Sequence, residues 1–189
     1  MENKVIIFTA PSGSGKSTIV QNILNNGSFE LSVSATTRDK RDYEIDGKHY
    51  NFVSVDNFKN SIENDSFIEY EEVYTDQFYG TLKESVDNIW SEGKIVLFDV
   101  DVKGAIKLKE YFKDNALSVF IKVPSIHVLK ERLFLRGTEN DESLRKRINK
   151  FEEELQYMNR FDYVLINDVL EDTLNTINDE ISEWLKITK

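Results

Sequence analysis

Short apolar runs separated by longer amphipathic stretches dominate the pattern of hydrophobic and polar positions along the chain. The apolar runs that predict buried strands are 5–8, 95–98, 119–123 and 163–166. The stretches that predict helices by their spacing of apolar residues are about 16–25, 81–92, 102–112, 125–136, 141–158 and 170–186. Continuously apolar strands that alternate with helices are typical of a parallel sheet with helices on both faces. The pattern therefore predicts a layered α/β fold.

The pattern changes between about residue 33 and residue 81. Aromatic and charged residues alternate there, notably in 49–53 (HYNFV) and 67–74 (FIEYEEVY). Such alternation is typical of a small antiparallel sheet with one solvated face, inserted into the α/β core. A second polar insertion, 136–143, joins two of the predicted helices.

Size and composition narrow the classes of function. The 189 residues suit one domain with small insertions, and a net charge of −10 with a pI near 4.8 argues against a protein that coats nucleic acid. The absence of cysteine excludes disulfides, thiolate catalysis and cysteine-bound zinc, and two histidines make a histidine metal cluster implausible. Neither a signal peptide nor an apolar run of membrane-spanning length occurs, so we expect a cytoplasmic protein without a membrane partner.

The segment after the first predicted strand fits the phosphate-loop pattern G-x-x-x-x-G-K-[ST], with Ala10 in place of the first glycine. Gly13 and Gly15 allow the backbone N–H groups to converge on phosphate oxygens at the start of a helix. Lys16 can reach the terminal phosphates of ATP, and the Ser17 hydroxyl can bind Mg²⁺. The alternative is an ordinary Gly/Ser turn. The residues expected to bind ATP here are Ala10, Pro11, Ser12, Gly13, Ser14, Gly15, Lys16, Ser17 and Thr18.

Two aspartates follow the second apolar strand. Asp99 and Asp101 are two residues apart, so both carboxylates can face one crevice at the carboxyl end of the sheet. We expect Asp99 to bind Mg²⁺, directly or through water, and Asp101 to contact the acceptor. The alternative is a solvated start of a loop.

The chain resembles the guanylate kinases from about residue 4 to the last predicted helix. The motifs that carry the resemblance are APSGSGKST at 10–18, SATTRDKR at 34–41, DGKHY at 46–50, FIEY at 67–70, YGT at 79–81 and DVDVKG at 99–104. The resemblance implies a parallel P-loop core with a small mixed-β GMP-binding insertion and a helical lid. It also implies direct transfer of a phosphoryl group from ATP to GMP. It further implies that side chains of the insertion recognise the guanine base. One departure is Lys103, where an uncharged residue is common.

The resemblance assigns the acceptor residues. Arg38 and Arg41 match the arginines that hold the GMP phosphate, and an arginine fork suits that role because it binds phosphate bidentately. The guanine contacts it implies are Ser34, Glu69, Thr81 and Asp101, and the tyrosine contacts to the phosphate are Tyr50 and Tyr79. A carboxylate such as Glu69 only accepts hydrogen bonds, so it matches the N–H donors of guanine and repels N1 of adenine.

The predicted lid and a late strand end supply the remaining candidates. Arg132, Arg136 and Arg147 match the arginines that contact the ATP phosphates and the transferring group, where cationic donors lower the barrier. Asn167 matches a segment near the ATP adenine. With Lys16, the three arginines form the expected catalytic set.

These expectations divide the chain into three regions: a P-loop core of 1–33, 82–123 and 151–189, a GMP-binding region of 34–81, and a lid of 124–150. The expected partners are ATP, GMP and Mg²⁺, with no nucleic acid or membrane. Two alternatives stay open. One is a related kinase that acts on another small phosphorylated acceptor, such as a ribose bisphosphate. The other is a non-catalytic scaffold that binds phosphopeptides, although such domains typically lose the phosphate-loop lysine or the lid arginines.

Overall fold

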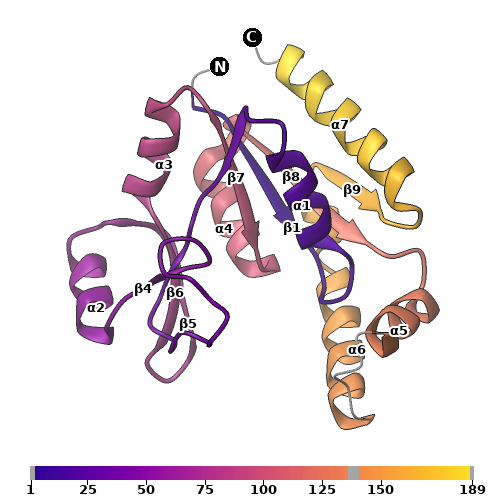
Figure 1. The fold of residues 1–189 in the computed structure, drawn as a ribbon, viewed down its shortest axis with the longest axis horizontal. Coiled ribbons are helices and arrows are strands. Elements are labelled where there is room, and N and C mark those ends of the chain that lie inside the picture. Colours follow the sequence, from indigo (N-terminus) through magenta and orange to yellow (C-terminus); the bar gives the residue numbers. More distant parts are fainter. Residues whose placement is uncertain (1–2, 136–140, 188–189) are drawn as a thin grey trace.

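A parallel sheet forms the centre of the computed structural model, which describes residues 3–135 and 141–187 (Figure 1). Its five strands lie in the order β2-β7-β1-β8-β9, and all the neighbouring pairs are parallel. The strands are β1 (Val5–Thr9), β2 (Phe29–Leu31), β7 (Ile95–Val100), β8 (Ala116–Lys122) and β9 (Tyr163–Ile166). The predicted α/β fold is thereby confirmed.

Helices cover both faces of this sheet because its central strands are apolar on both sides. Val5 and Ile7 face the layer that contains α3 (Lys83–Ser91) and α4 (Val102–Phe112). The alternate residues of β1 face α1 (Lys16–Leu24) and α7 (Leu170–Ile187) on the other side. Full burial of each such side chain contributes about 1.5–3 kcal/mol to folding. The two apolar layers hold the carboxyl ends of the strands at one edge of the core.

The insertion contains a second sheet in the order β4-β3-β6-β5. Its strands are β3 (Ala35–Thr36), β4 (Asn51–Phe52), β5 (Phe67–Tyr74) and β6 (Gln77–Leu82). The pairs β3–β6 and β5–β6 are antiparallel, but β3 and β4 are parallel. The mixed sheet implied by the resemblance is therefore confirmed, and the purely antiparallel sheet predicted from the alternation is wrong.

The sequence pattern also missed α2 (Val55–Glu63), which packs on this second sheet. Ser54 caps the helix by accepting a hydrogen bond from the backbone N–H of Asn57, at 3.2 Å. Phe58 is fully buried and stacks on Phe67 and Phe78 of the sheet. The alternating strands around it obscured this short helical period.

Strand β2 was also missed, because three half-buried residues at a sheet edge give too short an apolar run to detect. The helix predicted at 141–158 ends earlier than expected. Helix α6 (Asp141–Leu155) is followed by a separate 3₁₀ turn, η2 (Met158–Arg160), and a similar turn, η1 (Lys113–Asn115), follows α4.

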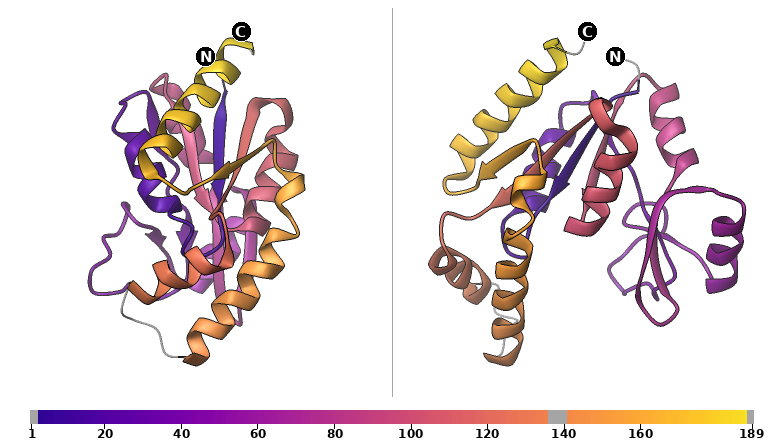
Figure 2. Two further views of the ribbon diagram at one scale, coloured as in Figure 1. Left: turned by 90° about the vertical axis from the view of Figure 1, so that its right-hand side faces the viewer. Right: turned by 180° about the vertical axis from the view of Figure 1, so that it is seen from behind.

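The insertion and the pair formed by α5 (Ile126–Leu135) and α6 extend from the same edge of the core, where the parallel strands end (Figures 1 and 2). They lie on opposite sides of that edge in Figure 1 and in the right view of Figure 2. Leu129 and Leu133 of α5 pack against Phe151 of α6 and Val123 after β8. Across residues 3–135 and 141–187, no helix has both the length and the apolar character that a membrane crossing requires.

Candidate active site

The phosphate loop joins β1 to α1, as its sequence predicts. Gly13 and Gly15 have positive φ angles of 92° and 86°, a backbone conformation that residues with a side chain rarely adopt. A Cβ atom at Gly13 would lie 2.8 Å from Leu129, and one at Gly15 would collide with the Asn167 amide. Both glycines are therefore required by conformation and by space, and α1 begins directly after Gly15.

Lys16 connects this loop to the end of β7. Its Nζ forms an ion pair with Asp99 Oδ1 at 2.6 Å and donates a hydrogen bond to the Val100 carbonyl, also at 2.6 Å. Parallel pairing of β1 with β7 produces this contact, because it brings the two strand ends together. The predicted ATP-binding lysine and the predicted Mg²⁺-binding aspartate thus lie in contact.

Asn167 lies under the phosphate loop, just after β9. Its side chain is buried, with Nδ2 donating to the Ser14 carbonyl at 2.7 Å and Oδ1 accepting from Thr173 at 3.4 Å. Both ends of the amide are therefore used within the protein. Asn167 was expected near the adenine, and this geometry adds a role in holding the loop.

One cavity of about 510 Å³ brings eight of the predicted site residues together at the carboxyl end of the parallel sheet. Residues from the phosphate loop, from the end of β7 and from the insertion share its walls. The predicted residues among them are Lys16, Ser17, Ser34, Tyr50, Glu69, Tyr79, Asp99 and Asp101. The donor and acceptor halves predicted from the sequence thus open into a common space.

Glu69 and Asp101 meet over the backbone of Gly104. A Cβ atom at Gly104 would lie 3.3 Å from Asp101 Oδ1 and 3.7 Å from Glu69 Oε2. Asp101 caps α4 by accepting from the Gly104 N–H at 2.8 Å, and Glu69 Oε1 accepts from the buried Thr81 hydroxyl at 2.8 Å. Burial raises the pKa of Glu69, an effect that the Thr81 hydrogen bond opposes.

Arg38 is fixed by its neighbours in the insertion. Its two terminal nitrogens donate to the two oxygens of Glu44 at 3.0 and 2.8 Å, and its Nε donates to Tyr79 at 3.2 Å. The hydrogen bond with Glu44 raises the pKa of Arg38, and the same bond lowers the pKa of Glu44 to about 2. Most of the Arg38 donors are already in use, so the position of its guanidinium is fixed before a phosphate binds.

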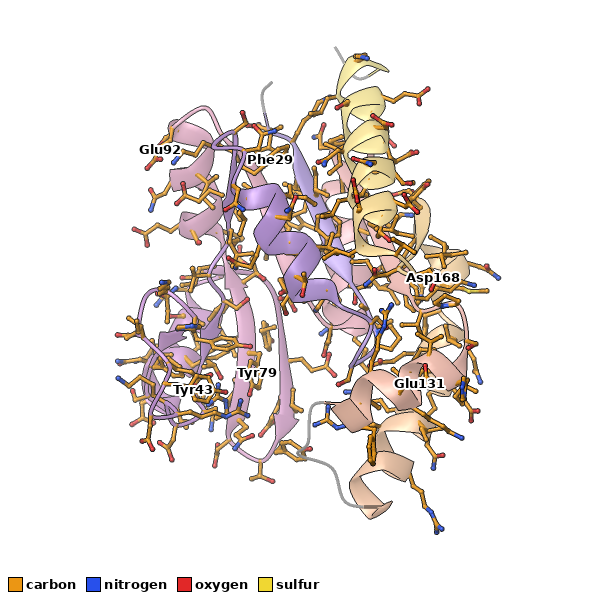
Figure 3. The ribbon with its side chains drawn as sticks, turned by 45° about the vertical axis from the view of Figure 1, so that its right-hand side comes forward. Phe29, Tyr43, Tyr79, Glu92, Glu131 and Asp168 are labelled. Carbon is orange, nitrogen blue, oxygen red and sulfur yellow. The ribbon has the colours of Figure 1, made fainter. Side chains whose placement is uncertain are left out.

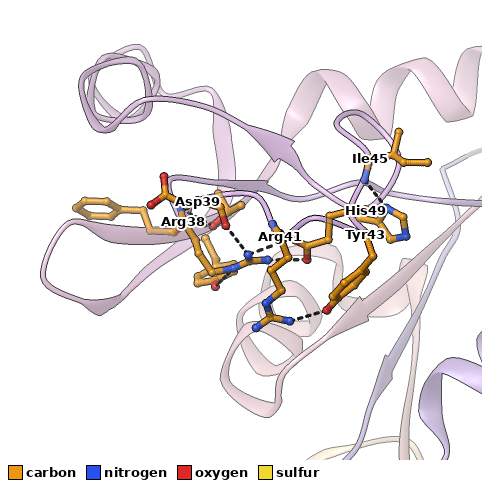
Figure 4. Close-up of polar contacts among 10 residues, drawn as sticks. Arg38, Asp39, Arg41, Tyr43, Ile45 and His49 are labelled. Atoms are coloured by element: carbon orange, nitrogen blue, oxygen red, sulfur yellow. Dashed lines mark hydrogen bonds and ion pairs between the residues drawn. The ribbon is translucent and has the colours of Figure 1, made fainter.

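The Arg41 side chain is exposed beside this cluster. Its guanidinium donates to the Tyr43 hydroxyl at 2.9 Å, while its backbone N–H donates to Glu44 at 2.8 Å (Figure 4). Tyr50 packs edge-on against Tyr79, and the Arg38 guanidinium lies 5.5 Å from the centre of the Tyr50 ring. Burial raises the pKa of Tyr50, so its hydroxyl remains a hydrogen-bond donor at neutral pH.

Two of the predicted lid arginines contact the core. Arg147 of α6 donates to the Ser12 hydroxyl of the phosphate loop at 2.8 Å, and Arg132 of α5 donates to the Asp168 carbonyl at 3.0 Å. Figure 3 shows Tyr79 of the insertion and Glu131 of α5 on opposite sides of the edge of the core where the parallel strands end. Arg136 lies outside the described residues.

The sequence reasoning missed Glu44, which holds Arg38 and the Arg41 backbone from a buried position. In the sequence, Glu44 is marked only by its position close to two arginines. Because this polar loop contains several acidic residues, that position did not single it out. Gly104 belongs to the DVDVKG motif, and its lack of a side chain allows the close approach of two carboxylates.

Comparison with known proteins is consistent with this geometry. The family model for guanylate kinase matches residues 2–184. A guanylate kinase from Porphyromonas gingivalis is 44% identical over 184 residues, covering 96% of this chain and 98% of the relative. A guanylate kinase from Bacteroides fragilis is 48% identical over 187 residues, covering 98% of this chain and 92% of the relative.

A solved structure extends the similarity to three dimensions. The crystal structure of guanylate kinase from Anaplasma phagocytophilum has a TM-score of 0.74 and 28% identity, covering 96% of this chain and 86% of the other. The family match and the relatives above 40% identity each cover nearly the whole chain, so the similarity is not confined to one motif or region. The chain belongs to the guanylate kinase family.

Proposed function

We propose that the chain transfers the terminal phosphoryl group of ATP to GMP and so makes ADP and GDP. The observation that carries this proposal is the shared cavity, which Lys16 of the phosphate loop and Glu69 of the insertion both line. The guanylate kinase relatives at 44% and 48% identity support the same reaction.

Guanine selection follows from the chemistry of Glu69 and its neighbours. An ionised Glu69 accepts hydrogen bonds from N1–H and the 2-amino group of guanine, and we assign to Asp101, which approaches the same glycine, Gly104, a share of the second donor. Hydrogen bonds to charged groups contribute about 1.5–3 kcal/mol each, so two of them strongly favour guanine over adenine. We assign the donor contact to guanine O6 to the hydroxyl of Ser34, whereas Thr81, whose hydroxyl donates to Glu69, contributes to the guanine site by orienting that carboxylate.

The phosphate of GMP binds beside the guanine site. We assign its contacts to Arg38, Arg41, Tyr50 and Tyr79. Glu44 fixes the Arg38 guanidinium before any phosphate arrives, which lowers the entropy lost on binding. Because Glu44 also neutralises part of that charge, Arg41, whose guanidinium is exposed, is the freer cation for the phosphate.

Transfer itself requires positioning more than acid–base chemistry. The acceptor is a phosphate oxygen that is already anionic, so the protein needs no strong general base. Lys16 and the lid arginines Arg132, Arg136 and Arg147 supply cationic donors around the transferring group. Arg147 already contacts the phosphate loop, which supports this role. The mechanism is direct in-line transfer without a covalent enzyme intermediate.

We propose that Ser17 and Asp99 hold Mg²⁺. Both residues line the cavity, and hydroxyl and carboxylate oxygens are ligands that Mg²⁺ prefers. When bound, Mg²⁺ neutralises charge on the phosphates of ATP. Asp99 is already held by Lys16, so the chain keeps the metal-binding carboxylate beside the phosphate-binding ammonium.

We further propose that 34–81 binds GMP, that 124–150 acts as a lid, and that the remaining segments form the catalytic core. A lid that closes over both substrates excludes water and limits hydrolysis of ATP. The proposed location is the cytoplasm, where ATP and GMP are available. No nucleic-acid or membrane partner is needed for this reaction.

A coupled assay with ATP and a panel of acceptors tests the proposal. We expect robust turnover with GMP and weak turnover with AMP, CMP and UMP, with dGMP accepted. Turnover with AMP but not GMP would overturn the guanine assignment while preserving the kinase assignment. Turnover only with a ribose bisphosphate would favour the related-kinase alternative. Phosphopeptide binding without turnover of any acceptor would favour a scaffold.

A further inference from the structure

Strand β5 is the outer strand of the insertion sheet, and helix α4 of the core lies beside it. An edge strand presents backbone groups that no neighbouring strand pairs. We propose that Lys103 and Lys107 of α4 are positioning residues for guanine recognition, because they hold this strand and the Glu69 side chain that it carries. The inference rests on the proposed function and adds to it the contacts that set the guanine site.

Both lysines reach the strand directly. Lys103 Nζ lies 3.3 Å from Glu71 Oε1, and Lys107 Nζ lies 3.3 Å from Glu71 Oε2. Lys107 Nζ also donates to the backbone carbonyl of Tyr70 at 2.8 Å. One carboxylate is thus held by two ammonium groups, and the strand backbone is held by one of them.

These contacts determine where Glu69 lies. Glu69 and Glu71 are two residues apart in a regular part of β5, opposite Thr81 and Tyr79, so their side chains point to the same face. The Glu69 carboxylate approaches α4 at Gly104, the residue between the two lysines that has no side chain. The two lysines, which lie before and after Gly104 in α4, therefore hold β5 against the helix next to the point where Glu69 approaches it.

The charges at this junction support the same role. Glu69, Glu71 and Asp101 all line the cavity, so without cations their carboxylates would repel one another. Burial tends to raise the pKa of Glu71, but the hydrogen bonds from Lys103 and Lys107 outweigh it and hold that pKa below its ordinary value. Lys107 also opposes the effect of burial on the pKa of Glu69.

The Lys103 side chain is exposed, with 70% of its surface accessible, whereas Lys107 is half-buried, with 41% accessible. Exposed ion pairs add little to fold stability, so removing these two should leave the protein folded. Their contribution is expected in the binding of GMP, which requires Glu69 and Asp101 at a fixed separation.

The test is the double variant Lys103→Gln/Lys107→Gln, assayed with ATP and GMP. We expect the KM for GMP to rise about three- to tenfold, the range that loss of exposed ion pairs allows. The KM for ATP and kcat should remain within about twofold, because the donor half is untouched. Lys59→Gln is the matched control, since it removes an exposed ion pair with Asp76 inside the insertion.

Two further variants separate positioning from a general structural effect. Lys103→Arg/Lys107→Arg keeps both charges and should restore the KM for GMP. Glu71→Gln should raise that KM by itself, and adding it to the lysine double variant should raise the KM by less than the product of the separate effects. An unchanged KM for GMP, or equal rises for GMP and ATP, would overturn the proposal. Absence of GMP turnover in the wild-type protein would instead overturn the proposed function, and this inference with it.

Discussion

Two glutamates in the insertion, the buried Glu44 and the half-buried Glu69, have opposite electrostatic settings. Glu44 faces the Arg38 guanidinium and the Arg41 backbone N–H, which together lower its pKa to about 2. Glu69 has a hydroxyl and a neighbouring aspartate beside it, and burial raises its pKa. The first carboxylate is already paired with a cation, whereas the second is the one that we propose accepts the N–H donors of guanine. The pH should therefore affect them in different ways.

The first prediction concerns Glu69. Its protonated form would present a donor to the donors of guanine, so kcat/KM for GMP should fall on acidification, with an apparent pKa above that of an ordinary glutamate. Glu69→Gln should lower kcat/KM for GMP about ten- to hundredfold, as expected from one lost charged hydrogen bond, and should remove this acid limb. Steady-state kinetics from pH 5 to 8 measure both effects. An acid limb that persists in the variant would assign it to another group.

The second prediction concerns Glu44. Its folded-state pKa of about 2 lies below the ordinary 4.5, so the stability it contributes is present above pH 4.5 and is lost as the pH falls toward 2. Glu44→Gln should therefore lower the Tm at pH 7, and the difference from wild type should shrink below about pH 4.5. Thermal unfolding monitored by circular dichroism provides the measurement. Glu63→Gln, at an exposed position at the end of α2, is the control and should change little.

At the scale of elements, the phosphate loop depends on a strand far along the sequence. Asn167 follows β9, and its amide donates to the Ser14 carbonyl inside the loop. Asn167→Ala should leave that buried carbonyl without its donor, at a cost of about 1–3 kcal/mol in the free energy of unfolding. Because we propose that the loop binds ATP, the KM for ATP should rise more than the KM for GMP.

Asn167→Asp sharpens this test. It keeps the size of the side chain but places a carboxylate oxygen against the Ser14 carbonyl. The aspartate variant should therefore be at least as impaired toward ATP as the alanine variant. Chemical denaturation and initial-rate kinetics compare the variants. Equal rises in KM for both substrates would show that Asn167 affects the whole fold rather than the phosphate loop.

Elements with a clear pattern of apolar residues or a complete motif were predicted correctly from the sequence. The apolar strands at 95–98 and 163–166 have counterparts in β7 and β9, and the phosphate-loop motif occupies the expected turn. Strand β2 and helix α2 were missed because each is short and its signal depends on tertiary packing, as the burial of Phe58 between two sheet phenylalanines illustrates.

The candidate site divides in the same way. Residues that belong to strong local motifs, such as Lys16 and Asp99, could each be proposed as site residues from the sequence alone, whereas their contact with each other follows from the pairing of β1 with β7. Glu44 and Lys107 could not be recognised, because their roles come from contacts between segments that only the folded chain brings together. Side chains that position other side chains carry little signal of their own in a single sequence.

At the scale of the whole molecule, the proposed site lies where three parts of the chain meet. The core supplies Lys16 and Asp99, the insertion supplies Arg38 and Glu69, and α6 supplies Arg147. If the parts act as proposed, donor and acceptor binding should be separable by single substitutions even though both ligands share one cavity. The insertion has its own apolar core around Phe58, so a change in the phosphate loop should leave it folded.

Lys16→Ala and Arg38→Ala form the reciprocal test. Lys16→Ala removes the ammonium that would hold the ATP phosphates, so transfer should fall at least about a thousandfold, while the Kd for GMP measured by calorimetry should stay within about threefold. Arg38→Ala should weaken GMP binding at least about tenfold and leave the affinity for a non-hydrolysable ATP analogue nearly unchanged. Lys16 also holds Asp99 and the Val100 carbonyl, next to Asp101, which we propose contacts GMP. Lys16→Ala is therefore the more demanding test of separate ATP and GMP sites. A collapse of GMP affinity in that variant would mean that the end of β7 couples the two halves, and that the donor and acceptor sites are one structural unit.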